Sequence, residues 1–284
     1  MFIPLHDANF LRHIRVQYVT LAIIVANVLI WVLFGTELFS NERAVRATIF
    51  SFGFIPAVAN GFESLPAAYD VLPEYTRYLS YSFLHGDFMH LAGNMLFIWV
   101  FGDNVEDAVG HLKFIFFYAA CAIAGALLHS FMFPDSESPL VGASGAAAGI
   151  IAAYLLLHPN VKIWILALGR IPIRLSALWV IGAWILYQIG NFLLTEGDPV
   201  SWSAHVGGIA AGLILLPLLK RRGVQLFDRT PEPEVIPPVP PPAVAEEGHT
   251  LPGQPEPEKT DEPKSGQEEK IVRPWGRGNA PGRK

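Results

Sequence analysis

Cysteine is almost absent from this sequence, and the single one, Cys121, lies inside an apolar run. One thiol excludes a disulfide framework, a CxxC redox pair and a cysteine-based zinc site. Charge is also scarce: Asp, Glu, Lys and Arg make up 16% of the residues, whereas an average soluble domain carries about 25%. The net charge of −5 and the lack of a basic block argue against a nucleic-acid partner. These absences disfavour an ordinary soluble domain.

Proline and acidic residues concentrate at the C-terminal end. Thirteen of the 23 prolines lie in residues 228–284, which include the run Pro-Pro-Val-Pro-Pro-Pro at 237–242. This composition predicts a disordered tail with polyproline-like pieces. Whether the tail is only solvated or binds an unknown partner stays open. We expect a cytoplasmic N-terminal segment at 1–16, a membrane domain at 17–222 and the tail at 223–284.

Long apolar runs dominate the residues before the tail. A helix that crosses a bilayer takes about 20 residues, and six runs reach or approach that length. They predict an all-α membrane protein with six transmembrane helices, of which the second, fourth and sixth are interrupted by polar residues and glycines. The runs are Tyr18–Gly35, Phe88–Val105, Phe114–Phe133, Gly142–Leu157, Leu175–Leu194 and Ser203–Leu219.

The placement of lysine and arginine predicts the orientation. Charged residues precede the first run and no A-x-A-like site follows it, so a secretory signal peptide is not expected. Nine Lys and Arg residues flank one side of the six runs and three flank the other. Because basic residues favour the cytoplasmic side, both termini are expected in the cytoplasm. Six runs without a targeting peptide favour a bacterial inner membrane.

The first loop, residues 36–87, is too aromatic for a simple tether. Eight phenylalanine and tyrosine side chains fall between residues 50 and 81. Aromatic rings are favoured at the membrane–water interface. We therefore expect this loop to lie in the membrane interface.

Polar side chains inside apolar runs are costly and mark functional candidates. His90 and Asn94 enter the second run four residues apart, so they share one helical face. The pattern differs from the zinc-protease HExxH motif, because no glutamate follows His85 or His90. An interhelical hydrogen bond and a shared chemical task both explain this pair.

Ser144 opens the fourth run among small residues. Gly145 and Gly149 form a GxxxG face that lets another helix approach closely. The same lack of bulk would expose Ser144 as a nucleophile. Its backbone N–H would lie at a helix N-terminus, where the partial positive charge stabilises an oxyanion.

His205 opens the sixth run and is followed by a second small-residue face, Gly208 and Gly212. With the N-terminus inside, the second, fourth and sixth runs all begin at the outer face. The two glycine faces would bring the fourth and sixth helices together, with Ser144 within reach of His205. A serine paired with a histidine base is suited to nucleophilic acyl transfer. No carboxylate lies at that depth, so we expect a dyad.

Three motifs resemble the signatures of the rhomboid family of intramembrane serine proteases in order, spacing and six-span topology. The resemblance covers about residues 10–222. The motifs are His90-x-x-x-Asn94, Gly142-Ala-Ser144-Gly145 and Ala204-His205-x-x-Gly208-x-x-x-Gly212.

The resemblance implies a role for each matched residue. Ser144 would be the nucleophile and His205 the general base, while His90, Asn94 and the Ser144 N–H would stabilise the oxyanion. The fifth run would act as a gate for substrate, and no metal or cofactor would be needed. Three further residues match family positions and are implied as supporting residues: His85, Arg77 and Glu106. Of these, Arg77 and Glu106 would fix the first loop against the bundle.

Two positions depart from the family pattern. Many members carry an aromatic residue four positions after the nucleophile, packed on the catalytic histidine, where this chain has Ala148. The tryptophan that is common before the loop arginine is Thr76 here. Neither change removes a catalytic group, but the first leaves open what orients His205.

The expected substrates are transmembrane segments of membrane proteins, cut near the outer face. The scissile carbonyl of a helix is tied into its hydrogen-bond ladder, so attack requires local unwinding. We expect small residues before the cut and helix-destabilising residues after it.

Three other readings compete with an active protease. The chain could bind transmembrane clients without cutting them, although the Ser144 and His205 pair argues against that. It could be a transporter or channel, but the sequence shows no repeat symmetry. It could hold haem or a metal through histidines, which are His85, His90, His129 and His205.

Overall fold

The computed structural model describes most of the chain before the proline-rich tail. The described residues are 2–7, 9–36, 38–39, 41–167, 169–195 and 200–228. Residues 223–228 of the predicted disordered tail are described, and there the Phe227 and Asp228 N–H groups donate to the Leu156 and Leu157 carbonyls. The rest of the tail, from residue 229 onward, lies outside the described residues.

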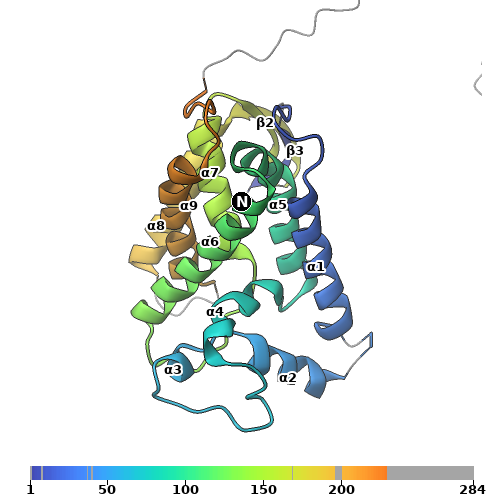
Figure 1. Cartoon of the computed structure of the whole chain (residues 1–284), viewed down its shortest axis with the longest axis vertical. Helices are drawn as coiled ribbons and strands as arrows, with labels where there is room; N and C mark the ends of the chain where they lie inside the picture. Colours follow the sequence, from blue (N-terminus) through green and yellow to red (C-terminus); the bar gives the residue numbers. More distant parts are fainter. Residues whose placement is uncertain are drawn as a thin grey trace, which may run out of the picture. The chain divides into compact units, whose positions relative to one another are not determined.

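Six long helices stand side by side in Figure 1, each within a few residues of a predicted apolar run. The mostly helical fold class is therefore confirmed. Among the described residues, α6, α8 and α9 are long and apolar enough to cross a membrane, while α1 and α7 are shorter apolar helices. The number of crossings stays a prediction. The six helices are α1 (Tyr18–Phe34), α5 (Phe88–Val109), α6 (His111–Met132), α7 (Ser144–Leu157), α8 (Ala177–Leu194) and α9 (Trp202–Leu219).

A three-stranded antiparallel sheet lies at one end of the helices, and no sequence pattern had indicated it. Its strand order is β1 (Phe2–Asp7), β2 (Lys162–Ala167) and β3 (Ile171–Ser176). The N-terminal segment thus pairs with the connection between α7 and α8 (Figure 1). Buried Ile163 and Ile165 of β2 face the core.

Close backbone contact joins α7 to α9, as the glycine faces predicted. A Cβ on Gly208 would lie 1.8 Å from the Gly145 carbonyl oxygen, and one on Gly212 would lie 2.2 Å from that of Gly149. Only glycine fits where two backbones approach this closely. This contact fixes the height of α9 against α7.

The C-terminal turns of α5 anchor the N-terminal segment and α1. Glu106 is fully buried and accepts hydrogen bonds from the backbone N–H groups of Val19 and Thr20, at 3.0 and 2.8 Å. It therefore caps the N-terminus of α1, where a negative charge is stabilising. Asp107 accepts from three successive backbone N–H groups, of Arg12, His13 and Ile14.

The first loop folds into short helices at the opposite end of the bundle (Figure 1). A β-bridge between Phe54 and Leu140 joins it to the loop before α7, and Tyr81 donates a hydrogen bond to Ala122 of α6 at 2.7 Å. Its placement in the membrane interface stays a prediction. The elements are α2 (Glu42–Phe52), α3 (Pro56–Ala59), η1 (Glu74–Thr76), α4 (Arg77–Ser80) and η2 (Tyr81–Phe83).

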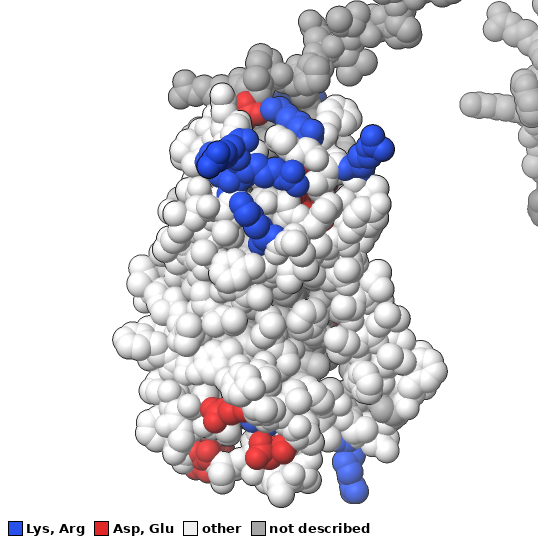
Figure 2. Space-filling model, in the orientation of Figure 1, with Lys and Arg blue, Asp and Glu red and all other residues white. Residues whose placement is uncertain are grey.

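Charge is segregated along the bundle. Figure 2 shows most of the visible lysines and arginines at the end that carries the strands. The visible acidic groups gather mainly at the first-loop end, and the face between the two ends is largely free of charge. An apolar band between polar ends is the surface that an integral membrane protein presents to lipid.

Candidate active site

A cavity of about 980 Å³ lies between α5 and α8, and residues of α7 and α9 also line it. Four residues singled out from the sequence line it together: His90, Asn94, Ser144 and His205. Most of the remaining lining is apolar. A few convergent polar groups in an apolar cavity are typical of an active or binding site.

Ser144 is the first residue of α7 and is half-buried at the cavity wall. The preceding turn passes through Gly142, whose φ of +120° lies in the region that glycine favours. A Cβ at Gly142 would lie 2.6 Å from His90 Nε2. The turn before Ser144 therefore runs against the His90 imidazole, and the first N–H groups of α7 lie at the same place.

Asn94 and His85 form a buried hydrogen-bonded pair. The Asn94 Nδ2 group lies 2.9 Å from His85 Nε2, and the Ala143 N–H donates to the same nitrogen at 3.5 Å. Burial lowers the pKa of His85 to about 3, and the neighbouring His90 adds to this effect. His85 is therefore neutral, so its Nε2 can accept the Asn94 proton. The second Asn94 amide proton remains for the cavity.

His205 has a partner that sequence reasoning missed. Its Nδ1 lies 2.8 Å from Oε1 of Gln188, a buried residue of α8. Among the described residues, no hydrogen bond joins Ser144 Oγ to His205. Catalytic hydrogen bonds are often loose without substrate and tighten in the reacting complex.

An aromatic residue of its own helix packs on His205, and an aromatic residue of α8 packs on that ring in turn. Trp202 packs edge-on against His205, with ring centroids 5.8 Å apart, and Tyr187 packs edge-on against Trp202 at 5.6 Å. Ala148, at the position where many rhomboids carry an aromatic residue, lines the cavity without a ring. Gln188 and Trp202 thus contact His205, on which Ala148 cannot place an aromatic ring.

His129 lies outside this group of residues. Its Nδ1 is 2.9 Å from both Ser201 Oγ and Ser203 Oγ, at the start of α9. It fastens α6 to α9. Among the described residues, no group of three or more His, Cys, Asp or Glu side chains is placed to hold a metal ion.

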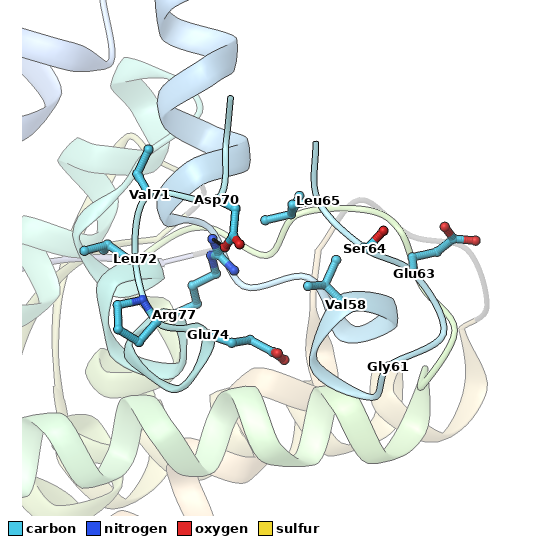
Figure 3. Close-up of a pocket in the computed structure, with 11 residues that line it drawn as sticks. Val58, Gly61, Glu63, Ser64, Leu65, Asp70, Val71, Leu72, Glu74 and Arg77 are labelled. Atoms are coloured by element: carbon cyan, nitrogen blue, oxygen red, sulfur yellow. Dashed lines mark hydrogen bonds and ion pairs between the residues drawn. The ribbon is translucent and has the colours of Figure 1, made fainter. Parts of the chain in front are cut away.

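Arg77 lies in the first loop, beside a second cavity of about 620 Å³ that Figure 3 shows. The buried guanidinium donates to the carbonyls of Ser51 and Tyr69, at 3.0 and 3.4 Å, and to Asp70 at 3.3 Å. Arg77 therefore ties the parts of this loop together. Glu106 lies at the opposite end of α5 from the first loop, so the implied role in fixing that loop is wrong. It contacts α1 and His111 instead.

Taken together, the bundle and its serine- and histidine-lined cavity define a helical integral membrane protein with a few polar side chains gathered in an apolar cavity. The Rhomboid domain family model matches residues 72–222, more than half of the chain. This chain belongs to the rhomboid family.

Individual relatives are similar over about half of this chain. Rhomboid protein 1, mitochondrial, of Saccharomyces cerevisiae is 31% identical over 47% of this chain and 38% of its own length. Rhomboid protease GlpG of Klebsiella pneumoniae is 28% identical over 50% of this chain and 48% of its own. Rhomboid protease GluP of Bacillus subtilis is 31% identical over 49% and 25%. The chain thus spans half or less of the length of these curated relatives.

Proposed function

We propose that this protein is an intramembrane serine endopeptidase that cuts transmembrane segments with a Ser144–His205 dyad. The observation that carries the proposal is the shared cavity, in which the serine at a helix N-terminus, two histidines and an asparagine converge. Relatives whose names include "rhomboid protease" support the same reaction.

In the proposed mechanism Ser144 Oγ attacks the scissile carbonyl while His205 Nε2 accepts its proton. His205 then returns this proton to the leaving amine. The oxyanion that forms would be stabilised by His90, the free Asn94 proton and the Ser144 backbone N–H. Gly142 supports this arrangement because it lets His90 approach the turn before the nucleophile.

The proposed substrates are transmembrane segments that unwind easily. The cavity is lined by α5 and α8, and most of its lining residues are apolar, as an apolar transmembrane segment would require. Small residues before the cut and helix-breaking residues after it would lower the cost of unwinding. We further propose a bacterial inner membrane location with both termini in the cytoplasm, because the basic residues gather at the strand-bearing end (Figure 2).

The test is cleavage of a generic transmembrane reporter in liposomes, combined with labelling by a serine-reactive fluorophosphonate probe. We expect Ser144→Ala and His205→Ala each to abolish cleavage and labelling. The matched controls are Ser138→Ala and His6→Ala, both at exposed positions, which should behave as wild type.

Cleavage that survives Ser144→Ala would contradict the assignment of the nucleophile. Folded wild-type protein that neither cleaves nor labels would overturn the protease proposal. That result would favour a rhomboid-like protein that binds transmembrane clients without cutting them.

A further inference from the structure

Gln188 is an unusual residue on α8, whose described face toward the bundle is otherwise apolar. The buried residues of this helix are Ala177, Val180, Ile181 and Gln188. Gln188 is 3% exposed, and its Oε1 lies 2.8 Å from His205 Nδ1. Burying an amide in an apolar setting is costly unless a hydrogen bond compensates, so the position of this side chain depends on the imidazole.

We infer that Gln188 is a positioning residue that holds His205 in the tautomer and orientation of a general base. The inference rests on the proposed function. An amide oxygen only accepts hydrogen bonds, so His205 carries its hydrogen on Nδ1 and leaves the Nε2 lone pair free. Nε2 is the atom that must face Ser144 in the cavity that both residues line.

The same bond remains useful throughout the proton transfer. When Ser144 attacks, its O–H bond breaks, an N–H bond forms at His205 Nε2, and the Nδ1–H bond stays intact. The imidazole becomes cationic, and the negative end of the Gln188 carbonyl dipole lies against Nδ1. Gln188 thus occupies the place of the third residue in a Ser-His-acid triad, with a neutral acceptor.

A purely structural role is the alternative, because polar side chains also join helices within membranes. The two roles predict different kinetics. A structural bond supports the fold, so its loss lowers thermal stability and the amount of folded protein. A positioning bond supports the base, so its loss lowers the rate of the chemical step in protein that remains folded.

The experiment compares Gln188→Met and Gln188→Glu in the full chain, with Asn191→Leu as the matched control. Asn191 lies about one turn further along α8, and its side-chain amide donates to the Tyr187 carbonyl of the same helix at 2.8 Å. We expect Gln188→Met to lower kcat and the rate of Ser144 labelling on the order of 10²-fold, with KM within about twofold. Gln188→Glu keeps an acceptor at the same place and should restore most of the rate.

Equal kcat and labelling rates in wild type and Gln188→Met would overturn the inference. So would a Gln188→Glu variant as slow as Gln188→Met. A wild-type protein without labelling or cleavage would instead be a failure of the proposed function.

A measurement on the protein with Gln188 in place covers the case in which Gln188→Met does not fold. Nitrogen-15 NMR of histidine-labelled protein distinguishes Nδ1–H from Nε2–H imidazole, and the His205 signals are those lost in His205→Ala. We expect Nδ1–H for His205 at neutral pH. Nε2–H would overturn the inference, whatever the activity.

Discussion

The backbone of Gly208 lies directly against that of Gly145, so closely that a Cβ on Gly208 would be 1.8 Å from the Gly145 carbonyl oxygen. Ser144 immediately precedes Gly145, and His205 lies one turn before Gly208. The contact between the two glycines therefore sets the height of the proposed base relative to the proposed nucleophile. The packing contact thus lies beside both residues of the proposed catalytic pair.

Gly208→Ala should separate α7 from α9 and remove the fold or the activity. Overpacking a tight contact costs about 1–3 kcal/mol and more where backbone must move, and no flexible side chain can yield here. Thermal unfolding in detergent measures the loss. The control is Gly182→Ala on α8, where nothing lies within 4 Å of the added Cβ. A Gly208→Ala variant as stable as Gly182→Ala would contradict the close approach.

Arg77→Lys should loosen the first loop although the charge is kept. The guanidinium donates to Ser51, Tyr69 and Asp70 from one buried position, and the single ammonium of lysine cannot reproduce this fork. Limited proteolysis should cut the loop faster in this variant. The control is Arg43→Lys, at an exposed position in α2. Equal cleavage rates for the two variants would show that Arg77 does not hold the loop.

The sequence was informative where the signal is local. Apolar runs predicted the helices within a few residues, and glycine spacing predicted the α7–α9 contact. The sheet was missed because β1 pairs with β2 more than 150 residues away, and neither strand has a periodicity that stands out beside an apolar helix. Gln188 was missed because it forms no recognisable motif with a second polar residue three or four positions away. Its role becomes visible only when α8 is packed beside His205.

Removing the charge of Glu106 should destabilise the start of α1. Its carboxylate accepts from Val19 N–H, Thr20 N–H and Thr20 Oγ1, and buried hydrogen bonds to a charged group are worth about 1.5–3 kcal/mol each. We expect Glu106→Gln to lower the free energy of unfolding by about 2 kcal/mol. Thr20→Val should cost less in the Glu106→Gln background than in wild type. If the losses of stability from Glu106→Gln and Thr20→Val simply add, the two residues do not share one cap. The control is Glu63→Gln, at an exposed position.

The docking of the N-terminal strand should weaken as the pH rises. Burial raises the pKa of Asp7 to about 6 from its ordinary value of 3.8, against hydrogen bonds from Tyr154 and Asn104 that lower it. The folded state therefore holds this proton more tightly than the unfolded state. The contribution of Asp7 to stability is complete below about pH 3.8 and is lost as the pH rises through about 6.

Unfolding measured between pH 4 and pH 7 tests this linkage. Asp7→Asn keeps a neutral side chain at every pH, so this variant should lose less stability than wild type on going from pH 4 to pH 7. An identical pH dependence in wild type and Asp7→Asn would contradict the raised pKa.

His85 should influence catalysis through its hydrogen bond to Asn94. Its neutral Nε2 accepts one Asn94 amide proton at 2.9 Å, which directs the other toward the cavity. Removing an oxyanion donor typically costs about 10²–10³-fold in kcat, so we expect that loss for Asn94→Ala. His85→Phe keeps the Asn94 amide but removes the hydrogen bond that orients it, so we expect kcat to fall about tenfold.

A double-mutant cycle separates this indirect effect from a direct one. In the Asn94→Ala background there is no amide for His85 to orient. His85→Phe should therefore cause no further loss of kcat in that background. If the two losses multiply instead, His85 must act on the substrate or on Ser144 by a route of its own. His90→Phe is the comparison, because His90 lies at the turn before Ser144 and its proposed donor is separate from Asn94. Its loss should multiply with that of Asn94→Ala.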